Sequence, residues 1–268
     1  MATPKAIDLN YRADGPPGAP VLVLSHALGL SLAQWDPQVA PLSRAFRVVR
    51  YDHRGHGGSP VPAGPYTIEE LGRDLVHLLD RLGLDRVFFC GLSLGGMVGM
   101  WIASNAPERI DRLVLCCSAA RMARPDDFAE RARTVREHGI EPIAQALIGQ
   151  WFTRRFKVHH PDTVARIRDV LLSTPPEGYA AACEAIAQMD LREELRRIKA
   201  PTLVIGAEQD QSTPPEKSRE IAEGIPGAAL VVIPDAAHIA NVEQPDAVSD
   251  QILDHLTTHL KEVRHEPR

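Results

Sequence analysis

The fold is decided by one stretch of the sequence, Val87-Phe-Phe-Cys-Gly-Leu-Ser-Leu-Gly-Gly-Met97. Its Gly-x-Ser-x-Gly pattern fixes only three positions and arises by chance in about one chain in ten of this length. The flanks make the pattern informative. Residues 86–90 are apolar and aromatic, as in a buried strand, and residues 95–105 suit a buried helix that ends before Pro107. We therefore predict a strand, a sharp turn that carries Ser93, and a helix.

Short apolar runs alternate with helical patterns on both sides of this stretch. The runs that predict strands lie at residues 6–12, 21–24, 47–51, 86–90, 113–117, 202–206 and 230–233. The patterns that predict helices lie at residues 32–42, 68–82, 95–105, 215–223 and 246–261. Such alternation indicates an α/β fold with a mostly parallel central sheet and helices on both of its faces.

The alternation stops between residues 121 and 200, where no strand pattern occurs. This segment is rich in arginine, and helices are expected at residues 125–138, 141–151, 161–172, 177–188 and 190–198. A crossover between two parallel strands needs far fewer residues. We predict that residues 121–200 form an inserted helical cap above the carboxyl edge of the sheet, and that residues 1–120 and 201–268 together form the α/β core.

Composition limits the partners and the compartment. The 268 residues are 44% hydrophobic and carry a net charge of −5 without a basic stripe, which argues against nucleic acid as a partner. No apolar run is long enough to cross a membrane, and the N-terminus lacks the apolar segment of a signal peptide. The four cysteines lack metal-ligand spacing, so we expect reduced, buried thiols, a cytoplasmic protein, and neither metal nor cofactor. The sequence leaves monomer and homodimer open.

Ser93 needs a base and a third group that orients the base, because a serine hydroxyl is a poor nucleophile at neutral pH. Asp210 and His238 follow two late strands, at the edge where open α/β sheets build their sites. Glu208 and Asp235 are the alternative acids; Glu208 lies nearer the strand end and Asp235 lies close to the base in sequence. The ten other histidines lack this late placement after a strand, although His26 could still line the site.

The oxyanion that forms when Ser93 attacks a carbonyl needs two N–H donors aimed at one point. One is expected from Leu94, directly after the nucleophile and at the start of a helix. The other is expected from the loop after residues 21–24, where we favour the Leu28 N–H over its neighbour Ala27. Backbone donors leave no side-chain signature, so this expectation depends on position alone.

The three side chains, together with Asp52-His-Arg-Gly-His-Gly-Gly-Ser59 after an early strand, resemble the α/β-hydrolase family over nearly the whole chain. The resemblance implies the α/β-hydrolase fold. The family usually has an additional short strand before residues 6–12, for which the N-terminus looks too short. We expect the motif at residues 52–59, with Asp52 and Arg54, to shape the loop under the site.

The resemblance can be narrowed. Residues 91–100, 112–117, 151–152, 178–183 and 189–191 are similar to 3-oxoadipate enol-lactonases of aromatic compound catabolism. The core motifs are shared with perhydrolases, epoxide hydrolases and C–C bond hydrolases. The resemblance implies a serine hydrolase that opens 3-oxoadipate enol-lactone to 3-oxoadipate through an acyl-enzyme. A cofactor-free perhydrolase or a broad small-ester carboxylesterase is the alternative, and a non-catalytic small-molecule receptor is the alternative of another class.

An enol-lactone of this kind carries a free carboxylate, which an arginine would bind most naturally. The candidates at the hinge or in the cap are Arg121, Arg124, Arg154 and Arg155, of which we favour Arg121 and Arg154. Trp151, a large apolar residue with an N–H group, is the cap residue expected to line the pocket.

Overall fold

A seven-stranded sheet forms the centre of the computed structural model, which describes residues 6–263. Residues 1–5 and 264–268 lie outside the described range. The second of these segments contains His265, one of the ten other histidines. The strand order across the sheet is β1-β3-β2-β4-β5-β6-β7. The strands are β1 (Tyr11–Asp14), β2 (Val21–Ser25), β3 (Arg47–Tyr51), β4 (Val87–Leu92), β5 (Ile110–Cys116), β6 (Thr202–Ala207) and β7 (Ala229–Ile233).

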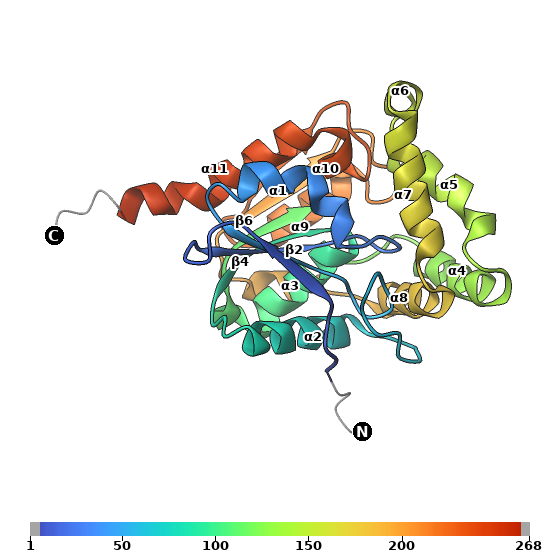
Figure 1. Cartoon of the computed structure of the whole chain (residues 1–268), viewed down its shortest axis with the longest axis horizontal. Coiled ribbons are helices and arrows are strands. Elements are labelled where there is room, and N and C mark those ends of the chain that lie inside the picture. Colours follow the sequence, from blue (N-terminus) through green and yellow to red (C-terminus); the bar gives the residue numbers. More distant parts are fainter. Residues whose placement is uncertain (1–5, 264–268) are drawn as a thin grey trace.

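The sheet is parallel except at one edge, where β1 runs antiparallel to β3. Every residue of β4 and β6 is buried, as expected for parallel strands that helices cover on both sides. Helices α1 (Asp36–Leu42) and α11 (Pro245–Val263) lie on one face, and α2 (Ile68–Arg81) and α3 (Leu94–Asn105) lie on the other (Figure 1). The predicted α/β fold is therefore confirmed.

Shorter helices complete the core. They are η1 (Leu32–Trp35), η2 (Pro107–Arg109), η3 (Leu195–Arg197), α9 (Pro215–Gly224) and α10 (Ala240–Glu243). No helix within residues 6–263 is long and apolar enough to cross a membrane. All four cysteines are buried and unpaired. Cys117 does not lie in a strand as predicted, because β5 ends at Cys116 and Cys117 turns to a φ of 43°.

The remaining helices gather beyond one end of the sheet, at the right of Figure 1. We call them the cap helices: α4 (Pro125–His138), α5 (Glu141–Trp151), α6 (Arg154–His159), α7 (Pro161–Ser173) and α8 (Pro176–Gln188). Helix α6 was not predicted, and the helix predicted at residues 190–198 is only the 3-10 turn η3. The Leu191 amide donates to the Ala120 carbonyl oxygen at 2.8 Å and ties the start of this segment to the core.

The predicted first strand is also shifted. The strand begins only at Tyr11. Two backbone amides before it, those of Ile7 and Asn10, donate to side chains and not to a neighbouring strand. The Ile7 amide donates to Asp74, and the Asn10 amide donates to Ser59.

The strand order creates the place for a site. The chain moves from β2 to β3 on one side and then crosses back to β4 on the other side of β2. Ser25, the last residue of β2, lies opposite Gly91 of β4. The loops that follow these two strands are therefore neighbours, as at the binding crevice of open α/β sheets.

Candidate active site

Ser93 lies on the predicted sharp turn, between the end of β4 and the start of α3. Its φ of 55° and ψ of −114° are unfavourable for a residue with a side chain and cost about 1–3 kcal/mol. The neighbouring glycines permit the turn. A Cβ atom on Gly91 would lie 2.2 Å from the Gly95 carbonyl oxygen, and one on Gly95 would lie 2.2 Å from the Ser25 carbonyl oxygen. The turn exposes the serine to a cavity at the end of the sheet.

Asp210 and His238 meet at this same edge, on the loops after β6 and β7. The His238 Nδ1 atom lies 2.8 Å from Asp210 Oδ2, and both side chains are buried. Asp210 is held by its own loop: its Oδ1 accepts hydrogen bonds from the amides of Ser212 and Thr213, and its Oδ2 accepts one from the Thr213 hydroxyl. A carboxylate on Nδ1 keeps the proton there and leaves Nε2 as the basic atom. His238 and Ser93 both line the cavity.

The alternative residues lie elsewhere. Glu208 is exposed, and its carboxylate accepts a hydrogen bond from the backbone N–H of Asp235 at 3.1 Å. Both residues therefore lie on the surface. His26 is buried behind the cavity and does not line it. Its Nδ1 donates to the Ala27 carbonyl oxygen at 2.7 Å, and its Nε2 accepts from the His53 amide.

Of the expected oxyanion donors, Leu94 directly follows Ser93, and Leu28 lines the same cavity as Ser93. Leu94 is the first residue of α3, so its N–H has no partner within the helix. Leu28 lines the cavity, and its N–H has no hydrogen-bond partner within the described residues. The Ala27 N–H, the alternative, donates to Gln34 Oε1 at 2.8 Å. Of these two neighbours, Leu28 is thus the one whose N–H remains available.

Three histidines pack against one another under this loop: His26, His53 and His56. His56 Nε2 accepts from the Gly29 amide at 3.0 Å, and its Nδ1 donates to the Arg54 carbonyl oxygen at 3.1 Å. Burial lowers the pKa of His56 to about 3, helped by His26, while the Arg54 carbonyl and Asp52 oppose this shift. Burial also lowers the pKa values of His26 and His53. All three are neutral at pH 7.

The protein is expected to lose stability as pH falls from about 6.5 toward 3. In that range the unfolded chain binds protons at these histidines and the folded chain does not, so each fully shielded histidine contributes a loss of about 1.4 kcal/mol per pH unit. His56→Gln, which can accept from Gly29 and donate to Arg54, should flatten the dependence. Urea unfolding at pH 7, 6 and 5 measures it, with exposed His159→Gln as the control. An unchanged slope in His56→Gln would contradict the expectation.

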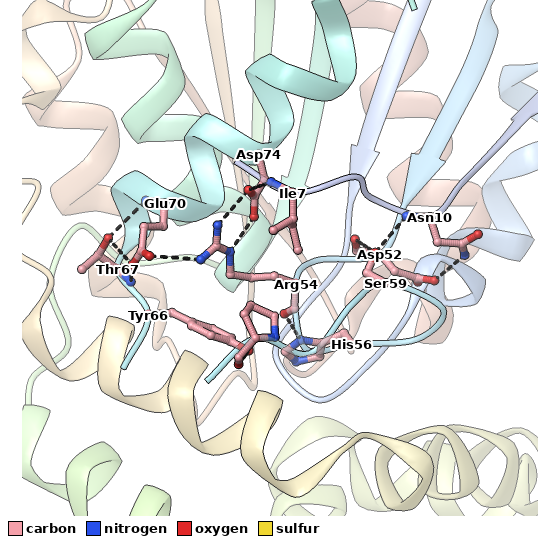
Figure 2. Close-up of polar contacts among 11 residues, drawn as sticks. Ile7, Asn10, Asp52, Arg54, His56, Ser59, Tyr66, Thr67, Glu70 and Asp74 are labelled. Carbon is pink, nitrogen blue, oxygen red and sulfur yellow. Dashed lines mark hydrogen bonds and ion pairs between the residues drawn. The ribbon is translucent and has the colours of Figure 1, made fainter. Parts of the chain in front are cut away.

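The motif at residues 52–59 forms polar contacts beneath the site and does not line the cavity (Figure 2). Asp52 accepts from the amides of Leu32 and Gly58, which joins η1 to this loop. Arg54 makes two hydrogen bonds to buried Asp74, at 2.6 and 2.8 Å, and one to Glu70 at 3.0 Å. The Arg54 side chain therefore fixes the loop to α2, in agreement with the structural role expected for it.

The cavity has a volume of about 330 Å³, enough for a small ligand. Core and cap residues both line it, among them Ala27, Leu28, Ser93, His238, Met122, Phe128, Arg131, Trp151 and Tyr179. Trp151 is thus where the sequence places it. Arg121 and Arg154 do not line this cavity: Arg121 is half-exposed 3.6 Å from Asp190, and Arg154 lies on a separate surface depression beside α6. Arg131 of the cap lines the cavity in their place.

Sequence reasoning missed Arg131 and Tyr179. Arg131 lies on α4 with its guanidinium carbon 4.7 Å from the centre of the Phe128 ring. Tyr179 lies on α8; its hydroxyl is buried and has no hydrogen-bond partner within the described residues. Burial and the neighbouring Cys183 thiol raise the pKa of the phenol while Arg131 opposes the rise, so the hydroxyl keeps its proton and can donate it to a ligand. The helical spacing of Phe128, Ala132 and Val135 was a usable signal, because it places Arg131 beside the buried face of α4.

The cap helices and the histidine loop are joined by a buried seam. The Ile239 amide donates to the Trp151 carbonyl oxygen at 3.1 Å. Glu243, which is buried, accepts from the amide and hydroxyl of Thr153 and from the Ala237 amide. The segment that carries His238 is therefore bonded to the junction of α5 and α6.

Known proteins resemble this chain in both sequence and structure. Residues 20–245 match a family described as alpha/beta hydrolase fold. The chain is 39% identical over 250 residues to 3-oxoadipate enol-lactonase 2 of Acinetobacter baylyi, covering 93% of each. It is 46% identical to the enol-lactonase from Burkholderia xenovorans LB400, with a TM-score of 0.91 over 93% of this chain and 96% of that one. A malate-bound thermophilic esterase from Thermogutta terrifontis is 35% identical, with a TM-score of 0.89 over 96% and 95%.

Proposed function

The chain belongs to the α/β-hydrolase family and is a carboxylic ester hydrolase, and we propose that it opens a small carboxylated enol-lactone, 3-oxoadipate enol-lactone to 3-oxoadipate. Relatives that bear the name of this activity cover nearly the whole chain. We place the reaction in the catabolism of aromatic compounds and the enzyme in the cytoplasm. The four buried, unpaired cysteines fit a reducing compartment.

Ser93 attacks the lactone carbonyl while Nε2 of His238 accepts the hydroxyl proton, and Asp210 stabilises the imidazolium. The amides of Leu94 and Leu28 hold the tetrahedral oxyanion. Its collapse breaks the ring C–O bond and expels an enolate, which is a good leaving group. The enolate takes up the proton held by His238 and becomes a ketone, so the imidazole is neutral again. Water then attacks the acyl-enzyme with His238 as base. The dicarboxylate leaves and Ser93 regains its proton.

The observation that carries the proposal is an arginine without a carboxylate partner in the cavity. Three cationic side chains line it apart from His238. Arg124 pairs with Asp127 at 3.1 Å, and Lys217 pairs with Glu220 at 2.7 Å. Arg131 has no acidic partner within the described residues. A guanidinium in a partly enclosed pocket is well suited to a ligand carboxylate.

Tyr179 supports this assignment. Among the fully buried polar side-chain atoms of the described residues that lack a hydrogen-bond partner, its hydroxyl is the one that belongs to a cavity-lining residue. A buried donor without a partner is costly, and a ligand carboxylate would supply the missing acceptor. Ser93 and His238 line the same cavity. The cavity therefore holds groups for the reacting carbonyl together with groups for an anion.

Arg131→Met is expected to lower kcat/KM for the carboxylated lactone by about 10- to 100-fold, mainly through KM, because a hydrogen bond to a charged group contributes about 1.5–3 kcal/mol. The assay follows the loss of enol-lactone absorbance with purified protein. A neutral ester of similar size should be hydrolysed equally well by both proteins. Arg133→Met, an exposed position on the same helix, is the matched control.

Three outcomes would count against the proposal. An equal loss on the neutral ester would show that Arg131 supports the fold and not the anion. A strong preference of the wild type for neutral esters or for perhydrolysis would favour the broad esterase or perhydrolase alternative. Tight lactone binding without turnover would favour the receptor alternative.

A further inference from the structure

Gln34 is a buried glutamine of η1 that contacts the oxyanion loop and takes no direct part in the proposed reaction. Its side chain lies in the protein interior and does not line the cavity. Its Oε1 accepts the N–H of Ala27 at 2.8 Å, and its Nε2 donates to Asn241 Oδ1 at 3.1 Å. One amide group thus holds the loop after β2 and the segment that follows His238.

Contacts on the other side of Ala27 hold the next peptide group. The Ala27 carbonyl oxygen accepts from His26 Nδ1 at 2.7 Å and from the Leu30 amide at 3.2 Å. The Ala27–Leu28 peptide is trans, so its N–H points opposite to this carbonyl. With the Ala27 N–H held by Gln34 and the Ala27 carbonyl oxygen held by His26 and Leu30, Leu28 is the neighbour of Ala27 that lines the cavity with a free N–H.

We propose that Gln34 is a positioning residue that engages the Ala27 N–H and thereby makes Leu28 the second donor to the oxyanion. The proposal rests on the proposed function in one respect, the attack of Ser93 on a carbonyl. It does not depend on which ester or lactone is attacked. Preorganised donors stabilise the transition state more than the bound substrate, so Gln34 should act on kcat and not on KM.

Gln38 provides a matched control in the same buried network. Asn241 Nδ2 donates to Gln38 Oε1 and to the Gln34 carbonyl oxygen, both at 3.0 Å, and Gln38 Nε2 donates to the Asn241 carbonyl oxygen at 2.8 Å. Gln38 is as buried as Gln34 and holds the same asparagine, but it has no contact with the Ala27 N–H. Removing the side-chain amide of either glutamine disturbs the segment after His238. Only its removal from Gln34 frees the Ala27 N–H.

The experiment compares Gln34→Met and Gln38→Met, which keep the side-chain length and remove the amide. Hydrolysis of p-nitrophenyl acetate is measured, together with inhibition by a phenylboronic acid that forms a tetrahedral adduct on the serine. Gln34→Met is expected to lower kcat by about 10- to 100-fold, somewhat less than deletion of one oxyanion donor. KM should change by less than about 3-fold, and the boronate should bind weaker by the factor lost in kcat. Gln38→Met should keep kcat within about 3-fold of wild type, although its melting temperature falls as well.

Equal losses of kcat in the two variants, or an unchanged kcat in folded Gln34→Met, would overturn the proposal. A measurement on the wild type needs no variant to fold: boronate binding should shift the amide proton signals of Leu28 and Leu94 and leave that of Ala27 in place. A shift at Ala27 in place of Leu28 would also overturn it. If the wild type hydrolyses the nitrophenyl ester and not the enol-lactone, the proposed substrate fails while these comparisons still decide the role of Gln34.

Discussion

Ser93→Ala is expected to lower kcat for ester and lactone hydrolysis by about 10⁴- to 10⁶-fold, the range found when the nucleophile of a serine triad is removed. The fold should survive, because the backbone of Ser93 is held without its hydroxyl. Its amide donates to the Cys116 carbonyl oxygen, and its own carbonyl accepts from the Ser118 hydroxyl and the Met97 amide. Alanine keeps the Cβ atom and hence the backbone conformation of the turn.

The measurement is steady-state turnover, combined with the intact mass after treatment with a fluorophosphonate. Wild type should gain one adduct at Ser93, and Ser93→Ala should gain none. Ser104→Ala, at the far end of α3, controls for loss of a hydroxyl on the same helix and should keep kcat within about 3-fold. If Ser93→Ala retained more than about 1% of kcat, another nucleophile would have to do the chemistry.

Asp210→Asn is expected to lower kcat by about 10³- to 10⁴-fold at neutral pH, by the tautomer effect known for a buried triad aspartate. Asparagine can still accept from the amides of Ser212 and Thr213 through one oxygen, so the loop keeps its shape. The other atom becomes an NH₂ group that faces Nδ1 of His238, 2.8 Å away in the wild type. That nitrogen must then lose its proton to Nε2, which can no longer accept one from Ser93.

Nitrogen NMR of the His238 ring reports the tautomer directly, and turnover reports the consequence. The control is Glu208→Gln, the alternative acid, which contacts the Asp235 amide and not the histidine. It should keep kcat within about 3-fold. A large loss in Glu208→Gln, with Asp210→Asn near wild type, would reverse the assignment of the acid.

The sequence predicted the features that depend on short stretches of neighbouring residues, such as the strands. The buried strands of the sheet are continuous apolar runs, and the order of Ser93, Asp210 and His238 places each after a strand of one parallel sheet. Because the carboxyl ends of parallel strands share an edge, sequence order alone brings these residues to one place. The structure agrees with that expectation for the Asp210–His238 pair, and the variants above test their roles.

What depends on packing between distant segments could not be predicted. We assign the choice between the N–H groups of Ala27 and Leu28 to Gln34, whose contact with Ala27 forms only when η1 packs against the loop after β2. The choice of Arg131 over Arg121 depends on which face α4 turns to the cavity. The helical pattern at residues 190–198 gives only the turn η3, in a segment whose start the Leu191 amide ties to the core.

The seam between Trp151, Thr153 and the segment Ala237–Glu243 limits how new specificities can be built on this scaffold. A cap taken from a relative and grafted at residues 121–200 would replace the partner of Ile239 and would leave the buried Glu243 carboxylate with the Ala237 amide but without its two Thr153 donors. The catalytic base would then sit on a loosened segment even though every core residue is native. Grafts that end before Trp151, or that keep residues 151–153 while exchanging α4 and α8, separate the choice of substrate from the integrity of the catalytic apparatus. Directed evolution of this enzyme should therefore concentrate diversity on the inner faces of α4 and α8.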